Sequence, residues 1–196
     1  MTWPFDNLER GKYGAILADP PWHYEVWAEG SSRTASSKYA VMPNADICNL
    51  PIGELAAPDC VLFVWATWPK LYDAFEAIKA WGFTYKTCGF DWMKADNTQP
   101  NFFEAEIPAQ VGMGYWTRAN TEPCLLATRG KPKRLNADVR MGIISPRREH
   151  SRKPEGVHGR IERLVAGPYV ELFARQRRPN WDCWGNQTDK FAEAAE

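Results

Sequence analysis

The chain lacks the features that mark secreted, membrane-spanning or metal-stabilised proteins. It contains no run of eighteen apolar residues, and its first residues, Met-Thr-Trp-Pro, do not form a secretory signal. Its five cysteines show no close pairing, and no cysteine–histidine group has the spacing of a metal site. We therefore expect a reduced intracellular compartment, no membrane partner, no disulfide and no bound metal.

An excess of one sign of charge is also missing, since 24 basic side chains balance 24 acidic ones. The distribution is uneven, with 8 basic and 12 acidic side chains in residues 1–98 and 16 and 12 in residues 99–196. A local basic stretch between Arg129 and Lys153 can steer a polyanion without a basic isoelectric point. We expect Arg147 and Arg148 to touch phosphates there, the alternative being a solvated loop without a ligand.

Glycine-rich phosphate loops are absent as well. Neither a Walker sequence nor a Gly-x-Gly-x-x-Gly occurs, which excludes the usual P-loop and dinucleotide-binding fingerprints. Tryptophan, by contrast, is abundant, and we expect some of the ten to line a site for flat ligands. Trp65 is one candidate for substrate binding, because it stands at the exit of a buried apolar run.

Apolar runs bounded by glycine and proline alternate with segments of helical period, which indicates an α/β protein. We predict strands at 13–18, 60–65, 83–94, 121–128, 169–174 and 181–184. We predict helices at 70–81 and 154–165, short ones at 44–50 and 51–55, and loops at 23–42, 95–114 and 129–153. This alternation favours a mostly parallel, doubly wound sheet, and we expect a single domain over residues 1–196.

The first predicted strand ends in Asp19-Pro20-Pro21-Trp22, at the strand end where open α/β sheets bind ligands. The prolines stop the strand and hold the turn rigid. The Asp19 carboxylate and the Pro20 carbonyl can accept hydrogens from the exocyclic amine of a nucleobase, and Trp22 offers a face for stacking. The motif therefore predicts a catalytic site for chemistry on such an amine. The alternative is a structural Pro-Pro turn in which Trp22 only packs.

Two later blocks extend the pattern: Ser151-Arg152-Lys153-Pro154-Glu155, and Glu171-Leu172-Phe173-Ala174-Arg175 followed by Pro179-Asn180-Trp181 and Gly185-Asn186-Gln187. In this order and spacing, the three blocks resemble the adenine-N6 methyltransferase family that includes the messenger-RNA methyladenosine writer. The likeness extends from about Tyr13 to Gln187, and bacterial and phage members are nearer to this chain in length. It implies a Rossmann-like fold that uses S-adenosylmethionine, with the amine-binding motif before the cofactor-binding strand.

The resemblance also implies roles for individual residues. Asp19 and Trp22 would serve the target adenine, and Tyr39 would be the tyrosine of a lid loop. The cofactor side would comprise Asp19, Ser151, Lys153, Glu171, Phe173, Arg175, Asn186 and Gln187. In this pattern Lys153 reaches the methionine moiety, Arg175 the ribose, and the Asn-Gln pair the ribose and adenine. The alternatives are solvated charges for Lys153 and Arg175, an edge charge for Glu171 and a plain turn at 186–187.

The expected activity is methyl transfer from S-adenosylmethionine to N6 of adenine in nucleic acid, with DNA preferred to RNA. The preference for DNA rests on the likeness to bacterial and phage members, which also implies a cytoplasmic protein of a bacterium or an infected host. We expect a monomer or a homodimer. An RNA substrate and a catalytically silent, nucleic-acid-binding partner subunit are the alternatives.

Overall fold

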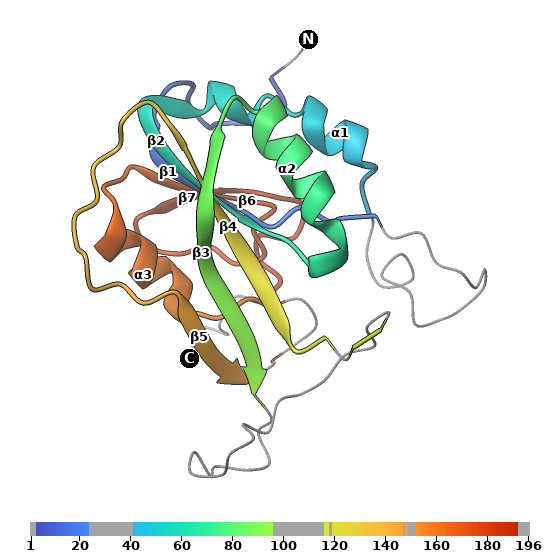
Figure 1. Cartoon of the computed structure of the whole chain (residues 1–196). Coiled ribbons are helices and arrows are strands. Elements are labelled where there is room, and N and C mark those ends of the chain that lie inside the picture. Colours follow the sequence, from blue (N-terminus) through green and yellow to red (C-terminus); the bar gives the residue numbers. More distant parts are fainter. Residues whose placement is uncertain are drawn as a thin grey trace.

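The computed structural model describes residues 3–23, 41–95, 116–117, 119–146, 148 and 152–191. Seven strands form one sheet in the order β5-β3-β4-β2-β1-β6-β7 (Figure 1). The strands are β1 (Tyr13–Ala18), β2 (Ala56–Trp65), β3 (Thr84–Ala95), β4 (Thr121–Arg129), β5 (Gly142–Pro146), β6 (Tyr169–Leu172) and β7 (Trp181–Trp184). The helices are α1 (Asn44–Asn49), α2 (Leu71–Ala80) and α3 (Gly156–Leu164), with 3-10 turns at η2 (Ile52–Glu54) and η3 (Trp68–Lys70).

The sheet is mostly parallel, as predicted. β1 pairs in parallel with β2 and β6, β6 with β7, and β3 with β5. Among the described strands, β4 alone runs the other way, antiparallel to both β2 and β3. The carboxyl ends of β7, β6, β1 and β2 therefore share one edge of the sheet with the amino end of β4.

Helices cover both faces of the sheet, because alternate residues of the central strands point to opposite sides. Ile16 and Ala18 of β1 belong to one core cluster with residues of α1 and α2. Ala15 and Leu17 belong to a second cluster with residues of α3. Figure 1 shows α1 and α2 together at the top of the view and α3 separately at the lower left. This doubly wound arrangement is consistent with a Rossmann-like methyltransferase fold.

The two longer helices follow from their apolar spacing. In α2, Ala74, Ala77 and Ile78 are buried at the i, i+3 and i+4 positions of one helical face. The helix is followed by Gly82, whose φ of 78° suits glycine.

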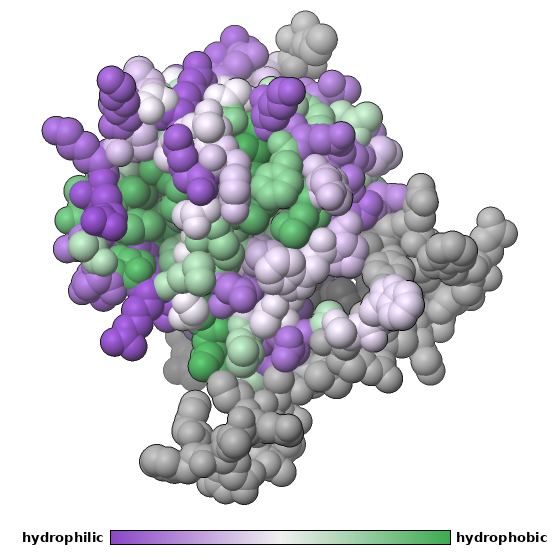
Figure 2. Space-filling model, in the orientation of Figure 1, coloured by the Kyte–Doolittle hydropathy of each residue, from purple (hydrophilic) through white to green (hydrophobic). Residues whose placement is uncertain are grey.

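In Figure 2, green and pale side chains lie between purple ones over the region of α2 and β3. The exposed aromatic residues of this region are Trp68, Tyr72, Phe75 and Tyr85.

The interpretation of residues 129–153 as one basic loop is wrong in two respects. The segment contains β5, which pairs with β3 and buries Ile143 in the second core cluster. A short strand with one buried side chain leaves little periodic signal in the sequence. In addition, Arg129 pairs with Cys60, at the end of the sheet opposite to Trp65. Because β4 is reversed, its carboxyl end delivers the first basic residues far from Asp19, so the basic stretch is not one patch.

Smaller differences concern strand ends. β2 begins at Ala56, earlier than predicted, and β6 ends at Leu172, because Phe173 takes a left-handed φ of 61°. Most of the loops predicted at 23–42 and 95–114 lie outside the described residues. No helix of the described part is long and apolar enough to cross a membrane.

Candidate active site

Asp19 is placed at the centre of the sheet edge by the two neighbours of β1. Ala18 pairs with Val64 on one side and with Leu172 on the other, so Asp19 lies at the carboxyl ends of three parallel strands. The motif then turns sharply, because the Trp22 N–H donates to the Pro20 carbonyl at 2.9 Å. The Met42 N–H donates to the Pro21 carbonyl, also at 2.9 Å. The turn therefore fixes the backbone on both sides of the prolines.

Trp22 and Trp65 do not offer the stacking faces that we predicted for a base. Trp22 is only 5% exposed, and its indole N–H donates to the Trp65 carbonyl at 3.0 Å. Trp65 is 1% exposed and belongs to the core. Both rings are therefore buried beside the Asp19-Pro20-Pro21-Trp22 motif and stabilise it by packing. The surroundings of Trp22 therefore fit the structural alternative, in which its ring only packs, better than the prediction of a stacking face.

Four charged side chains form a chain of ion pairs beside the motif. The Lys153 ammonium lies 2.9 Å from Oδ1 of Asp19 and 2.8 Å from Oε1 of Glu122. The other oxygen of Glu122, Oε2, lies 2.8 Å from the Lys94 ammonium. The exposed fractions of the side chains are 17% for Asp19, 15% for Lys153, 11% for Glu122 and 23% for Lys94. These charges are poorly hydrated, so each depends on its partners.

The pKa values of these groups reflect how the partners are shared. Burial raises the pKa of Asp19, with Glu122 adding to the effect, although Lys153 and Arg175 oppose it. Burial would also raise the pKa of Glu122, but Lys153 and Lys94 outweigh it and hold the pKa below its ordinary value. Burial would lower the pKa of Lys153, but Asp19 and Glu122 hold it above its ordinary value. Of the two carboxylates, Asp19 is therefore the one that binds a proton more readily.

Sequence reasoning missed Glu122 and Lys94. Glu122 is the second residue of β4, and it reaches the site because β4 enters the sheet at this edge. The signal that could have found it is an acidic residue at the start of the apolar run Glu-Pro-Cys-Leu-Leu-Ala. Lys94 lies near the end of β3, which pairs with β4 over the same residues. Nothing in its sequence surroundings distinguishes it from a surface lysine.

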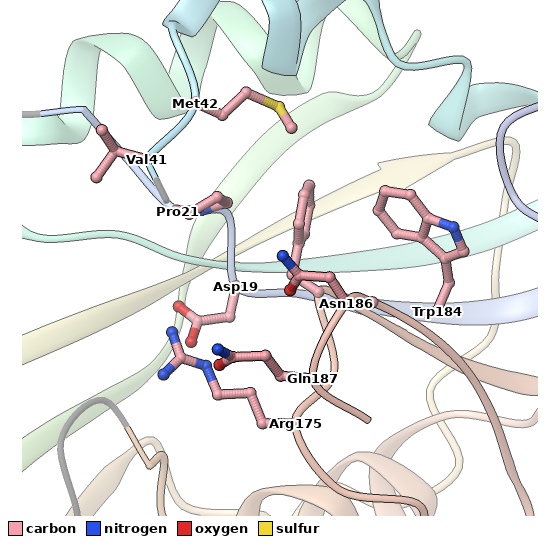
Figure 3. Close-up of a pocket in the computed structure, with 10 residues that line it drawn as sticks. Asp19, Pro21, Val41, Met42, Arg175, Trp184, Asn186 and Gln187 are labelled. Carbon is pink, nitrogen blue, oxygen red and sulfur yellow. The ribbon is translucent and has the colours of Figure 1, made fainter. Parts of the chain in front are cut away.

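A cavity of about 190 Å³ opens beside Asp19 (Figure 3). Its lining residues are Asp19, Pro21, Val41, Met42, Phe173, Arg175, Trp184, Gly185, Asn186 and Gln187. Figure 3 shows the polar ends of Asp19, Arg175 and Gln187 close together, with Val41, Met42 and Pro21 on the other side. The cavity thus combines hydrogen-bonding groups with apolar walls, as sites for small ligands do. It brings together the predicted residues Asp19, Phe173, Arg175, Asn186 and Gln187.

Local backbone features shape this cavity. A Cβ on Gly185 would lie 2.6 Å from the carbonyl oxygen and 2.8 Å from the nitrogen of Ala174, so only glycine lets the two strand exits approach so closely. The Ala174 N–H donates to the Trp184 carbonyl at 2.9 Å and closes this contact. Phe173 has a left-handed backbone that is costly for an aromatic residue, and such strain is typical of ligand sites.

A second, smaller cavity of about 40 Å³ adjoins the first and shares Asp19, Phe173 and Arg175 with it. Its other lining residues are Arg152, Lys153, His158, Glu171, Gln176, Arg178 and Phe191. The predicted cofactor residue Glu171 lies here, and its Oε2 is 2.8 Å from Nε2 of His158. Lys153 lines this cavity while its ammonium group is held by Asp19 and Glu122.

The remaining predicted residues have other outcomes. Tyr39, Arg147 and Ser151 lie outside the described residues. The Arg148 guanidinium forms an ion pair with Glu155 and donates to the Lys153 carbonyl at 3.0 Å. This ion pair competes with the phosphate contact that we predicted for Arg148. Within the described ranges, no group of three or more histidine, cysteine or acidic residues is arranged to hold a metal ion.

Comparison with known proteins identifies the family. The family model described as MT-A70 matches residues 13–187, from the first residue of β1 to the last polar residue of the larger cavity. The chain belongs to the MT-A70 family. The resemblance inferred from the motif blocks is thereby confirmed.

Several named methyltransferases are similar to this chain over nearly its whole length. The type II methyltransferase M.MunI of a Mycoplasma species is 32% identical over 92% of this chain and 80% of its own length. The N(6)-adenosine-methyltransferase catalytic subunit METTL3 of Homo sapiens is 30% identical over 91% of this chain. The N(6)-adenosine-methyltransferase MT-A70-like protein of Drosophila melanogaster is 30% identical over 94%. The chain spans less than a third of these two animal relatives, 29% and 28% of their lengths.

Proposed function

We propose that the chain transfers a methyl group from S-adenosylmethionine to the exocyclic N6 amine of adenine in nucleic acid, with DNA as the substrate. Membership of the MT-A70 family and similarity to proteins named N(6)-adenosine-methyltransferases support the reaction. The observation that carries the proposal is the Asp19 carboxylate, which stands at a strand end, lines the larger cavity and is paired with Lys153. That is a suitable acceptor for an amine that becomes more acidic as it reacts.

The larger cavity fits the proposed cofactor in the chemistry of its lining. Asn186 and Gln187 carry both donors and acceptors, which would hold a nucleoside, and Arg175 would approach its hydroxyl groups. Phe173 and Trp184 supply apolar surface for a flat ring. When bound, S-adenosylmethionine supplies a methyl group attached to a positively charged sulfur.

The residues of the motif would orient the target amine. Asp19 would accept one hydrogen of the amino group through a carboxylate oxygen, while Lys153 favours the ionised form of the carboxylate and fixes its position. The Pro20 carbonyl already accepts the Trp22 N–H and retains one lone pair for a second hydrogen. Most of the rate enhancement would come from alignment and from these fixed dipoles rather than from a strong base.

The choice of DNA rests on the similarity to M.MunI, which is named a type II methyltransferase. This chain covers 80% of the bacterial M.MunI methyltransferase but less than a third of the animal adenosine methyltransferases. An RNA substrate is the second candidate, because those relatives are named for adenosine and are almost as similar in sequence.

The test is transfer of a labelled methyl group to matched DNA and RNA oligomers, followed by nucleoside analysis. We expect N6-methyladenine in the DNA, and a loss of at least about 100-fold in rate for Asp19→Asn, the range for removing one preorganised polar group. Asp138→Asn is the matched control, because Asp138 pairs with Arg163 at the exposed surface. Label found in the RNA oligomer alone would show that the substrate is RNA and not DNA. Binding of oligomers without any transfer would indicate a silent partner subunit, and normal turnover of folded Asp19→Asn would place the chemistry elsewhere.

A further inference from the structure

Lys94 does not line either cavity described above, yet its ammonium group belongs to the chain of ion pairs that ends at Asp19. The links alternate in sign: Lys94 to Glu122 at 2.8 Å, Glu122 to Lys153 at 2.8 Å, and Lys153 to Asp19 at 2.9 Å. Glu122 uses a different oxygen for each lysine. The two lysines thus hold this carboxylate from both sides.

We propose that Lys94 is a positioning residue of the active site, which acts through Glu122 to keep Lys153 on the Asp19 carboxylate. The inference rests on the proposed function in one respect, namely that Asp19 is the group that receives the target amine. It goes beyond that function because Lys94 comes from β3, which contributes no residue to either cavity lining described above.

The balance of charge explains why Lys94 matters. Two ammonium groups and two carboxylates give a neutral set in which Glu122 contacts both cations. Without Lys94, one ammonium serves two poorly hydrated carboxylates, and water cannot replace the missing partner. Glu122 then competes with Asp19 for Lys153. Asp19 either loses its ion pair or binds a proton, because two carboxylates that share one cation repel each other.

The position of the Lys94 ammonium is itself fixed. Its backbone N–H donates to the Asn120 carbonyl at 3.0 Å, and its Nζ lies 5.1 Å from the centre of the Trp92 ring. The Trp92 indole in turn donates to the Ser145 carbonyl at 3.1 Å. Contacts to Glu122 of β4, to the residue before β4 and, through Trp92, to β5 therefore anchor a side chain that would sample many rotamers at an open surface.

Other groups face Asp19 and stay in place when Lys94 is changed. Arg175 approaches from the segment after β6, and Lys153 from the segment before α3. Among the described residues, the Cys124 thiol of β4, whose pKa burial raises, also interacts with Asp19, and the smaller cavity adds the charged or titratable side chains of Arg152, His158, Glu171 and Arg178. A change in Asp19 on substitution of Lys94 is therefore transmitted through Glu122 and Lys153.

The first experiment compares the pH profiles of methyl transfer for the parent, Lys94→Met, Lys94→Arg and the control Lys70→Met. Lys70 is a matched lysine, because it also forms an ion pair, with Asp73 at 2.6 Å, and is 20% exposed. We expect Lys94→Met to lower kcat by roughly 10-fold at the acid end of the profile, the scale of losing one hydrogen bond to a charged group. The loss should shrink at the alkaline end, since Asp19 is ionised there. Lys94→Arg should recover most of the rate, and Lys70→Met should follow the parent.

A second experiment needs no activity: the titration of the Asp19 carboxyl carbon by NMR, with aspartate labelled and Asp19→Asn for assignment. We expect Asp19 to titrate at higher pH in Lys94→Met than in the parent. The double variant Lys94→Met/Glu122→Gln removes the competing carboxylate and should reverse this shift, and it also serves if Lys94→Met alone does not fold. An unchanged Asp19 titration and an unchanged pH profile in Lys94→Met would overturn the inference. A shifted titration in a chain that methylates neither oligomer would overturn the proposed function but confirm that Lys94 acts on Asp19.

Discussion

Replacement of Lys153 by methionine is the sharpest test of the buried charges, because it removes the one ammonium shared by Asp19 and Glu122. Both ion pairs of Lys153 disappear, but Glu122 keeps Lys94. The variant therefore leaves one carboxylate, that of Asp19, without its ammonium partner in a site where its side chain is 17% exposed. Removing one partner of a buried pair costs about 3–5 kcal/mol, and we expect this loss at about pH 8.

The loss should depend on pH in a defined direction. Burial already raises the pKa of Asp19, and without the Lys153 charge the raised pKa lies higher still. A carboxyl whose folded pKa is raised lowers the stability fully above that pKa, and the penalty shrinks as the pH falls from it toward the ordinary pKa of 3.8. We therefore expect a clearly smaller loss at about pH 5.5 than at about pH 8. In the parent, the raised pKa of Lys153 contributes stability below its ordinary value of 10.5, so that contribution is constant between the two conditions.

The assay is urea unfolding followed by tryptophan fluorescence, with the free energy of unfolding compared at the two pH values. Lys70→Met is the control, because its ion pair with Asp73 is an i,i+3 pair of the sort that contributes about 0.2–0.5 kcal/mol. An equal, small loss for both variants at both pH values would refute the reasoning. It would mean that water reaches Asp19 and replaces the ammonium group.

Three further outcomes are expected. Gly185→Ala places a Cβ 2.6 Å from the Ala174 carbonyl oxygen, and such overpacking costs about 1–3 kcal/mol. We expect cofactor binding, measured by calorimetry, to weaken roughly tenfold while the far-UV circular dichroism spectrum stays unchanged. Trp22→Phe leaves the Trp65 carbonyl without its indole donor and should lower the unfolding free energy by about 1–3 kcal/mol, whereas lost oligomer affinity at full stability would restore the stacking role. For Arg148→Ala we measure the slope of log affinity for an oligomer against log salt concentration. The slope should change by less than the roughly 0.7–0.9 of one phosphate contact, because Glu155 already pairs with the Arg148 guanidinium. A change of the full size would contradict this.

Much of the fold could be predicted because its signals are local. The apolar run of β1 and the prolines after it lie within ten residues, so the strand, its end and the candidate catalytic carboxylate can be predicted together. The helical period of α2 and α3 and the glycine after α2 are equally local. The motif blocks at both ends of the chain carried the family, which the MT-A70 match over residues 13–187 confirms.

The environment of the aromatic residues could not be predicted in the same way. A tryptophan after a strand is equally compatible with an open stacking face and with a core position, since its sequence neighbours are the same in both cases. The burial of Trp22 and Trp65 depends on what covers them, which includes residues of β2 and the contact of Trp22 with Met42. β5 escaped prediction for a related reason, because its pairing with β3 supplies the strand geometry that its own five residues do not specify.

The sequence by itself determined which residue types stand at the ends of the central strands, because burial periodicity and turn chemistry are written in neighbouring residues. Only the tertiary structure decided that Asp19, Lys94, Glu122 and Lys153 meet. These residues come from four distant segments, and they converge because β4 is reversed between β2 and β3 and so brings its first residues to the edge where β1 and β2 end. Charge pairing of this kind depends on distances of about 3 Å across the sheet, and such distances follow from strand order and direction rather than from spacing along the chain.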